Sequence, residues 1–413
     1  MPLLYLMQLL LKKLRLGKYQ IALSTLLWFA LAAIAVFLES IRGLGYINNF
    51  LIYKGVFWHT LHQQNLYSLY PSEYFDSNHY GCLFSLVIAP FALLPVYIGC
   101  FLWALCNAWI LYYAIRQLPL SDKNKNIILL IGSIEMMTSI HSVEFNPAIS
   151  AYLILTCVLV YKEKDWWATL FIMIGFLCKL YSIVGLCFFV FSKHKTKFVL
   201  SSIVWFVILF LMPMIISSPE FIIKSYSDWF QSLIEKNSQN AQSYLFFGGT
   251  DMSVTGIIRR ITQSSKISGW AINIPAAILI LLPLLRFSQY KNIRFQLLYL
   301  AVISISVVIF SSSAESPTYI IAVIGVAIWY VLQEKNNKWA LSLMLFVLLI
   351  TSLSVTDLFP RYLYNNIVKP YSLKVLPCFI TWIVIILQLL RKNFIIDDKP
   401  ANEENFRSNS CLQ

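Results

Sequence analysis

The chain of 413 residues is 59% hydrophobic and only 12% charged, and its mean hydropathy of +0.69 excludes a soluble globular domain. The formal net charge of +13 does not indicate nucleic-acid binding, because an excess of Lys and Arg in a membrane protein mainly sets its orientation. The eight cysteines are scattered without a CxxC pair, so neither disulfides nor a zinc site is predicted.

Along the chain, apolar runs near the length of about 20 residues that crosses a bilayer predict about twelve transmembrane helices. They lie at 20–40, 98–115, 126–141, 146–161, 166–178, 180–192, 198–217, 268–286, 294–311, 317–332, 339–355 and 373–390. Segment 81–95 is short and broken by Pro90 and Pro95, so it is predicted to be re-entrant or kinked. The expected fold is one all-α polytopic transmembrane bundle over residues 20–392.

Both ends of the chain are predicted to lie outside this bundle, on the cytoplasmic side of the membrane. In residues 1–19 the apolar residues precede the basic ones, the reverse of a signal peptide, which favours an interfacial helix. Residues 393–413 are polar and are expected to form a disordered tail.

The orientation follows from the places where Lys and Arg gather. They concentrate in segments that are cytoplasmic if the N-terminus is inside: 1–19, 116–125, 161–165, 193–197, 286–294, 332–338 and 391–413. The positive-inside rule therefore predicts that both termini are cytoplasmic. The outer side then receives two large loops, 41–80 and 218–267, with smaller turns that include 142–146 and 312–316. Two long loops on one face predict that the functional site lies at the outer surface of the membrane.

The first outer loop, 41–80, collects polar groups that are scarce elsewhere. It holds three of the five histidines (His59, His62 and His79) and the carboxylates Glu73 and Asp76, among many aromatic residues. Functional residues concentrate on loops that a rigid scaffold holds, and aromatic side chains are common in sugar-binding segments. The alternative is an interfacial amphipathic helix followed by a solvated turn.

Ionisable residues within or beside the spans are a second set of functional candidates, because they are costly in a membrane. Glu135 lies inside the run 126–141, and Glu144 and Asn146 lie in the outer turn SVEFNP. Lys179 stands between two short apolar runs, which would place its ammonium in a cavity below the outer surface. The simpler alternative is a lysine that snorkels from a helix end.

The second outer loop, 218–267, contains an amphipathic stretch around DWFQSL and then the segment GGTDMSVTGIIRR. That segment combines glycines with Asp251, Ser253, Arg259 and Arg260. Glycine turns beside arginines can hold phosphate, since arginine bonds phosphate oxygens in pairs. Glu315 lies just before a span that begins with a proline, and it is either a site residue or a helix cap.

Taken together, these motifs resemble the family 87 glycosyltransferases, polytopic membrane enzymes of the GT-C class. The resemblance covers residues 20–335. It rests on NNFLIYKG, NLYSLYP, YFDSNHYG, APFALLP, LWALCNAW, EFNPAISA, CKLYSIVG, DWFQSL, DMSVTGIIRR and AESPTY. Each motif is weak alone, but their order along the chain and their placement on one membrane side make the resemblance specific.

The resemblance implies a catalytic base that this chain lacks at the usual position. The family usually has an aspartate before an aromatic residue at the start of the first outer loop, whereas this chain has Asn49. An amide cannot accept a proton, so the base is expected among the outer carboxylates. Asp76 is the first choice as base, with Glu315 facing it as a further catalytic or sugar-binding group. Glu39, at the end of the first span, is the alternative.

The resemblance also implies a set of substrate-binding residues, in which Glu144 stands where the family commonly has glutamine. Lys179, with Arg259 or Arg260, is expected to bind the donor phosphate. The full set of expected substrate-binding residues is Asn49, Tyr53, His79, Tyr80, Glu144, Asn146, Lys179, Asp251, Ser253, Arg259 and Arg260.

The function that the resemblance implies is transfer of a hexose, mannose first, from a polyprenyl-phosphate donor to a lipid or glycan acceptor. The place would be the outer face of a bacterial plasma (inner) membrane, with membrane lipids as surroundings and no nucleic-acid partner. No cofactor is expected; a divalent metal is compatible with the reaction, but no motif indicates one. The alternatives are transfer of another sugar and, from a different class, a transporter or flippase of lipid-linked saccharides.

Overall fold

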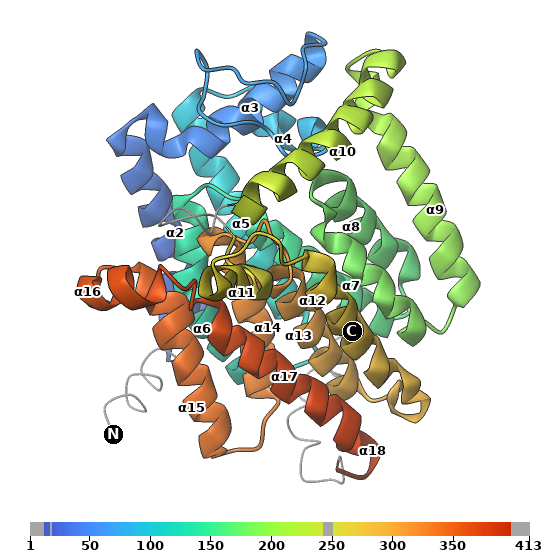
Figure 1. Cartoon of the computed structure of the whole chain (residues 1–413). Coiled ribbons are helices and arrows are strands. Elements are labelled where there is room, and N and C mark those ends of the chain that lie inside the picture. Colours follow the sequence, from blue (N-terminus) through green and yellow to red (C-terminus); the bar gives the residue numbers. More distant parts are fainter. Residues whose placement is uncertain (1–11, 17–18, 243–250, 398–413) are drawn as a thin grey trace.

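The computed structural model describes residues 12–16, 19–242 and 251–397, and most of them are helical (Figure 1). The first half contains the hairpin β1 (Lys13–Leu16) and β2 (Tyr19–Ala22) and the helices α2 (Leu23–Arg42), α3 (Asn48–Leu61), α4 (Phe84–Ala92), α5 (Val96–Gln117), α6 (Asp122–His141), α7 (Asn146–Tyr161), α8 (Asp165–Cys178) and α9 (Lys195–Leu211). The second half contains α10 (Pro219–Gln242), α11 (Val254–Thr262), α12 (Gly269–Leu281), α13 (Ile293–Ile309), α14 (Tyr319–Val331), α15 (Lys338–Phe346), α16 (Arg361–Leu363), α17 (Val375–Arg391) and α18 (Phe394–Asp397).

Segments of 3₁₀ or π geometry extend or join these helices. They are η1 (Leu44–Ile47), η2 (Leu180–Phe191), η3 (Met212–Ile215), η5 (Leu282–Leu285), η6 (Phe287–Gln289), η7 (Ser316–Thr318), η8 (Val347–Ser352), η9 (Leu353–Val355) and η10 (Tyr364–Val368). The predicted all-α class is confirmed, with one small hairpin added to it.

The helices α6, α7, α13 and α14 form the centre of the bundle. Almost every residue of α7 and α13 is buried, and α14 packs against both α6 and α13. A helix that is apolar on all sides belongs in such a position. On the flanks, α2 packs on α6, α5 on α7 and α17 on α13. Polar groups at the ends of the central helices are therefore held on a rigid base.

Four helices are long and apolar enough to cross a bilayer: Leu23–Arg42, Val96–Gln117, Lys195–Ile215 and Lys338–Val355. Several other apolar helices, including α7, α13 and α17, are shorter. α9 leaves aliphatic side chains uncovered, among them Leu200 and Ile203, as helices in contact with lipid do. The chain is a membrane protein by these features, while the full set of predicted spans remains a prediction.

The N-terminal segment differs from the sequence prediction. Residues Lys13–Leu16 pair with Tyr19–Ala22 as antiparallel strands, so they are not part of an interfacial helix. The pairing satisfies backbone groups, and β2 runs directly into α2. The first long helix consequently begins at Leu23 rather than at residue 20. Residues 1–11 of the predicted interfacial helix lie outside the described residues.

The predicted disordered tail is ordered at its beginning. Residues Phe394–Asp397 form α18, and the side chain of Phe394 is buried. The backbone N–H of Phe394 donates to Gln289 Oε1 (2.9 Å), and Asn292 Nδ2 donates to the Phe394 carbonyl (3.0 Å). These contacts anchor the start of the tail on the turn before α13. Residues 398–413 lie outside the described residues.

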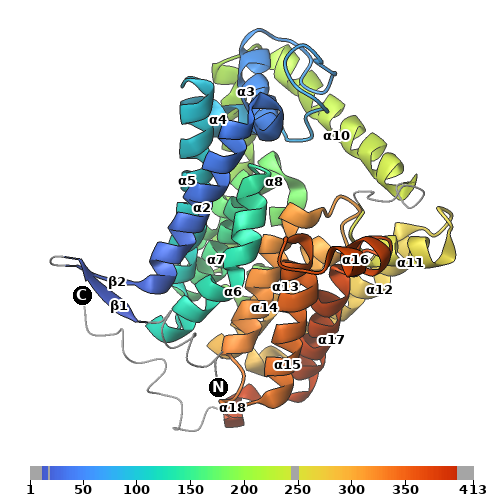
Figure 2. The same cartoon turned by 90° about the vertical axis from the view of Figure 1, so that its left-hand side faces the viewer.

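The helix α10, from the second predicted outer loop, lies at the same end of the bundle as α3 and α4, while α11 lies away from them (Figure 2). Much of 41–80 is helical, and α3 buries Phe50, Tyr53 and Phe57 against its neighbours. α3 is therefore packed on protein rather than lying free at the membrane interface. Segment 81–95 contains α4, a nine-residue helix with Pro90 inside it, which is too short to cross a bilayer.

Bonds between predicted cytoplasmic turns support the grouping on which the orientation depends. Side chains join Lys162 to Gln117, Lys193 to Glu163, Arg286 to the Lys392 carbonyl and Arg294 to the Leu332 carbonyl. Each bond links two segments that were expected to share one side of the membrane. Which side faces the cytoplasm remains a prediction from charge.

Candidate active site

The turn between α6 and α7 presents Glu144 at the end of the bundle. α6 ends at His141, and α7 begins at Asn146 with Pro147 in its first turn, a position that suits proline. Val143 has a backbone φ of 52°, a left-handed conformation that is rare for a β-branched residue. A strained turn of this kind is held by its surroundings, here by the burial of Val143. The direction of Glu144 is thereby fixed.

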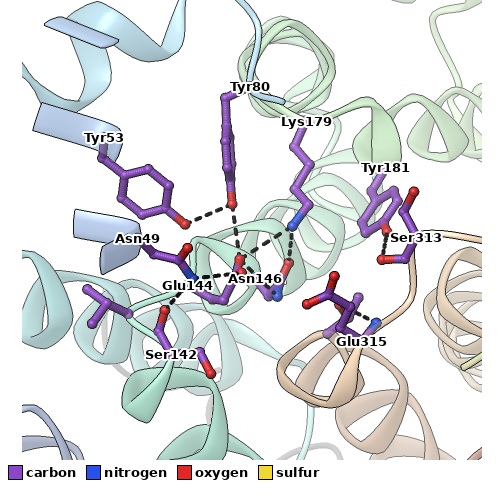
Figure 3. Close-up of polar contacts among 12 residues, drawn as sticks. Asn49, Tyr53, Tyr80, Ser142, Glu144, Asn146, Lys179, Tyr181, Ser313 and Glu315 are labelled. Atoms are coloured by element: carbon purple, nitrogen blue, oxygen red, sulfur yellow. Dashed lines mark hydrogen bonds and ion pairs between the residues drawn. The ribbon is translucent and has the colours of Figure 1, made fainter. Parts of the chain in front are cut away.

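Four side chains converge on the Glu144 carboxylate, as Figure 3 shows. Asn49 Nδ2 donates to Oε1 (3.3 Å), while Oε2 accepts from Tyr80 Oη (3.0 Å) and Asn146 Nδ2 (3.4 Å). Lys179 Nζ lies 3.5 Å from the same Oε2 atom. We call these five residues, Asn49, Tyr80, Glu144, Asn146 and Lys179, the Glu144 cluster. They come from α3, the loop before α4, the α6–α7 turn, α7 and the end of α8.

Lys179 reaches the cluster because the chain breaks its helical course there. The residue is extended, between the end of α8 and the start of η2. Its Nζ donates to Asn146 Oδ1 (2.8 Å) and lies 5.3 Å from the ring centres of Tyr80 and of Tyr181. Tyr181 Oη in turn lies 3.1 Å from Ser311 Oγ, in the turn before α14. The ammonium thus has polar and aromatic partners instead of snorkelling toward lipid headgroups.

Gly81 brings the loop of Tyr80 against the end of α8. Its backbone N–H donates to the Cys178 carbonyl (3.0 Å), and a Cβ at this position would lie 2.1 Å from the Leu177 carbonyl oxygen. A Cβ would also clash with the ring of Trp229 in α10. Only glycine permits this close approach. The approach sets Tyr80 and Lys179 on the same side of Glu144.

Tyr53 and Asn49 lie beyond Tyr80, on the side away from Lys179 (Figure 3). Tyr53 Oη lies 3.0 Å from Tyr80 Oη, and both rings are buried. Burial, reinforced by the negative charge of Glu144, raises the pKa of both phenols, so they stay protonated and can donate. Asn49 Nδ2 also donates to the Ser142 carbonyl (2.7 Å), which fixes its amide toward the carboxylate.

Glu315 lies at the edge of the cluster. It is the N-cap residue of η7, and its backbone N–H donates to Thr318 Oγ1 (3.3 Å), so the helix-capping alternative is realised at least by its backbone. Its carboxylate points toward Asn146 and Lys179 (Figure 3). Burial and then the charge of Glu144 raise the pKa of Glu315 above its ordinary value, although two lysines oppose the rise. Glu315 can therefore hold a proton to a higher pH than an ordinary glutamate does.

A match to a family model covers residues 78–355, more than half of the chain, and the model is that of glycosyltransferase family 87. The chain belongs to glycosyltransferase family 87. A search of the curated proteins gives no match. The predicted family is confirmed, and with it the class of the activity: this membrane protein is a glycosyltransferase. Four of the five cluster residues, Tyr80, Glu144, Asn146 and Lys179, lie within the matched range.

Asp76 of this glycosyltransferase, the expected base, lies apart from those contacts. Its side chain is 63% exposed, and the backbone φ of 72° places it in a tight left-handed turn. Oδ1 accepts from the backbone N–H of Ser77 (2.8 Å), and Oδ2 lies 4.0 Å from Lys236 Nζ. His79, on the same loop, lies with Nδ1 2.9 Å from Ser232 Oγ in α10. A role of Asp76 as base remains a prediction.

Glu39, the alternative base, is held in a separate ion pair. Both carboxylate oxygens accept from Arg42 Nη1 at 3.0 Å, and Oε1 lies 2.7 Å from His141 Nδ1. The side chain is 8% exposed. Glu39 therefore ties the end of α2 to the end of α6 and supports the turn that carries Glu144.

The predicted phosphate-binding segment forms its own buried network. Asp251 Oδ1 accepts from Ser253 Oγ, and Asp251 Oδ2 accepts from Arg259 Nη1 (3.2 Å). Arg260 Nη2 donates to the Asp251 carbonyl (3.3 Å), and Tyr319 Oη donates to the next carbonyl, that of Met252 (2.7 Å). Burial raises the pKa of Asp251. These bonds of the two arginines thus stay within the 251–267 segment, and Tyr319 ties this segment to α14. A phosphate-binding role of Arg259 or Arg260 remains a prediction.

Sequence reasoning named Glu135 but missed its partner. Lys374 Nζ lies 2.9 Å from Glu135 Oε1 and donates to Ser316 Oγ (2.8 Å), next to Glu315. Lys374 opens the apolar run 373–390, so the rule that intramembrane charges are paired could have found it. Within the described residues, no group of three His, Cys, Asp or Glu side chains is placed to hold a metal ion.

Proposed function

We propose that this glycosyltransferase moves a hexose, mannose first, from a polyprenyl-phosphate donor to a lipid or glycan acceptor. The Glu144 cluster is the observation that carries the proposal. Transfer of a glycosyl group to a hydroxyl requires a proton acceptor near that hydroxyl and positive charge near the leaving phosphate. Glu144 and Lys179 supply these two groups side by side, 3.5 Å apart.

Glu144 is the proposed base, and its contact with Asn49 is the strongest support. The resemblance implies aspartate at position 49 and commonly glutamine at position 144, whereas this chain has the amide and the carboxylate in the opposite order. The two side chains touch, with Asn49 Nδ2 3.3 Å from Glu144 Oε1. The exchange therefore keeps one carboxylate and one amide in the same contact. Asn49 lies before the matched range 78–355, so its correspondence rests on the motif NNFLIYKG.

The proposed step is a single displacement that needs one base rather than two carboxylates. An acceptor hydroxyl oxygen forms a bond to the anomeric carbon of the donor, and the bond from that carbon to the phosphate oxygen breaks. The hydroxyl proton passes to Glu144, and polyprenyl phosphate leaves with one more negative charge. Lys179 turns from Glu144 toward this phosphate and neutralises the new charge. Tyr80 and Asn146 hold the carboxylate in place meanwhile.

The setting of the reaction is part of the same proposal. The cluster lies at the end of the bundle where α3 and α10, from the two predicted outer loops, lie (Figure 2), so the reaction would take place at the outer face of a bacterial plasma membrane. Both termini would then be cytoplasmic. A polyprenyl chain would stay in the lipid while its phosphate enters between α8 and the loop before α4, the two segments that carry Lys179 and Tyr80.

The experiment uses membranes that contain the full-length protein, incubated with labelled polyprenyl-phosphate mannose or polyprenyl-phosphate glucose. Transfer of label from one of these donors to a lipid or glycan fraction is the expected result. Glu144→Gln should abolish it, and Asp76→Asn, which is also isosteric, should leave most of it. Failure of both donors would refute the proposed donor class. Loss with Asp76→Asn and retention with Glu144→Gln would assign the base to Asp76.

A further inference from the structure

A polar cavity of about 250 Å³ lies between α10 and the loop that joins α3 to α4. Its walls include Asp228, Gln231, Glu235 and Gln239 from α10 and Asn65 and His79 from the loop. The residues from α10 recur at every third or fourth position, so they share one face of that helix. The volume is below the roughly 300–1,000 Å³ of pockets for drug-sized molecules, which suits a ligand no larger than about one sugar ring.

Direct bonds hold the two walls together. Trp229 Nε1 donates to the His79 carbonyl (2.8 Å), and His79 Nδ1 lies 2.9 Å from Ser232 Oγ. Asn65 Nδ2 donates to Asp228 Oδ2 (3.4 Å) across the cavity mouth. The cavity is therefore formed by the fold itself and does not depend on an occupant.

The charges around the cavity disfavour phosphate. Asp228 and Glu235 bring two carboxylates, whereas Lys236 brings one ammonium. Burial, with the charges of Lys236 and Lys179 acting in the same direction, lowers the pKa of His79 to about 4, so its imidazole is neutral near pH 7. A negative wall repels an anionic group.

The chemistry of the wall fits a neutral ligand rich in hydroxyl groups. Carboxylate and amide side chains accept and donate hydrogen bonds in the pattern that vicinal hydroxyls require. Tyr67 contributes the main apolar surface of the lining, so a polyprenyl chain would find little to contact. A sugar ring satisfies both requirements.

The cavity adjoins the Glu144 cluster through consecutive residues. His79 lines the cavity, while Tyr80, the next residue, donates its phenolic hydrogen to Glu144 Oε2 (3.0 Å). Asn78 fixes this junction, because its Nδ2 donates to the Tyr80 carbonyl (3.1 Å). The charge of Lys179 acts on His79 across this junction, so the cavity lies close to the Glu144 cluster.

We infer that this cavity is a subsite for a neutral pyranose ring of the acceptor, which makes the acceptor a glycan or a glycolipid headgroup rather than a simple lipid alcohol. The inference rests on the proposed function only in assigning the bound sugar to the acceptor substrate. Binding of the sugar ring itself does not require that the enzyme turn over.

The first test measures binding alone, on the purified full-length protein in detergent. Methyl α-mannoside and methyl α-glucoside serve as probes, and saturation-transfer NMR reports their contact with the protein. Glu235→Gln and Asp228→Asn should each weaken binding of the better probe by at least about tenfold, since a bond to a charged group is lost. Glu220→Gln is the matched control, because Glu220 lies on the same helix outside the cavity. Equal binding by all variants would overturn the subsite.

The second test separates the subsite from the proposed function. In the transfer assay, Glu235→Gln should raise the KM for a soluble glycoside acceptor about tenfold and leave the donor KM unchanged. Suppose that the parent protein binds the probe, loses that binding with Glu235→Gln, and yet transfers sugar from neither donor. This result would refute the donor proposal and keep the subsite. Full transfer with an unchanged acceptor KM in Glu235→Gln would refute the subsite and keep the donor proposal. A raised donor KM would assign the cavity to the donor sugar and overturn the inference.

Discussion

Glu135 in α6 and Glu144 in the turn after it each face one lysine, but the two pairs are built differently. The pair of Glu135 and Lys374 is closed: the nitrogen-to-oxygen distance is 2.9 Å, and the side chains are 0% and 2% exposed. The pair of Glu144 and Lys179 is looser, at 3.5 Å, with 16% and 22% of the side chains exposed. A closed buried pair already has its partners, whereas a partly open pair can exchange one partner for a substrate.

The two ion pairs also differ in the polar side chains that surround them. Lys374 has Ser316 as a further acceptor, and the remaining surroundings are helices of the core. The Glu144 carboxylate instead accepts from three side chains besides Lys179, namely Asn49, Tyr80 and Asn146. The first pair therefore holds helices together, whereas the proposed function assigns the chemistry to the second.

The largest expected effect comes from Glu144. Glu144→Gln removes the proton acceptor and keeps the shape, so transfer should fall by about 10²- to 10⁴-fold while the melting temperature in detergent stays near that of the parent. Adding Asn49→Asp to Glu144→Gln returns a carboxylate to the same contact. The double variant should regain a substantial part of the lost activity.

The single variant Asn49→Asp is the control for this rescue. It places two carboxylates 3.3 Å apart or closer, where one must take up a proton. Its activity should fall below that of the parent. The loss should be greatest at high pH, because the shared proton is then lost and both carboxylates are charged. A double variant as inactive as Glu144→Gln alone would show that position 49 cannot supply the base.

Lys374→Met should act on stability instead. It leaves the Glu135 carboxylate buried without its partner, at a cost of about 3–5 kcal/mol in the free energy of unfolding. The expected result is a large loss of folded protein in detergent, measured by the melting temperature. Adding Glu135→Leu removes the orphaned charge and should restore much of that stability. If Lys374→Met folds normally but is inactive, the contrast between the two pairs fails.

Lys179→Ala should lower kcat/KM for the donor by an intermediate amount and leave the kinetics of the acceptor nearly unchanged. Loss of one charge-assisted contact to the phosphate corresponds to about 1.5–3 kcal/mol, or roughly ten- to a hundredfold in kcat/KM for the donor. The acceptor KM should change little, and the folded yield should stay near that of the parent. Lys224→Ala is a matched control on α10, where the side chain is exposed. A fall in yield as large as the fall in activity would make Lys179 structural.

The sequence was sufficient for the class of the fold and for naming all five residues of the Glu144 cluster. Apolar runs predicted α6, α7, α13 and α14 because a membrane helix is a local pattern that needs no tertiary information. The strand of residues 13–16 was missed, since its pairing with residues 19–22 depends on the contact between two short strands and not on hydrophobic periodicity. Such short hairpins leave little signal in composition.

The geometry of the site could not be derived in the same way. Asn49 and Glu144 were each singled out, but nothing local says that α3 lies across the α6–α7 turn so that the two side chains touch. Asp76 was favoured because it precedes the re-entrant segment, yet its exposure depends on how the loop folds over α10. The arginines of 251–260 were assigned to phosphate by composition, but nothing local says that both of their guanidinium groups contact Asp251.

The smallest expected effect concerns Glu315 and depends on pH. Burial and the charge of Glu144 raise the pKa of Glu315, whereas in the unfolded chain it titrates near its ordinary value of about 4.3. Between these two values the folded protein binds a proton that the unfolded chain has lost. Stability contributed by the neutral carboxyl is therefore lost as the pH rises from the unfolded pKa through the raised one.

Glu315→Gln carries no such proton, so its stability should not fall over this range. Melting temperatures of the purified protein from pH 4 to pH 8 should therefore diverge, with the variant gaining a few degrees on the parent as the pH rises. Glu334→Gln, at a position with 79% of the side chain exposed, is the control and should follow the parent. If the melting temperature of Glu315→Gln changes with pH in parallel with that of the parent, the charge of Glu144 does not raise the pKa of Glu315. Glu315 would then not be an interacting neighbour of the pair formed by Glu144 and Lys179.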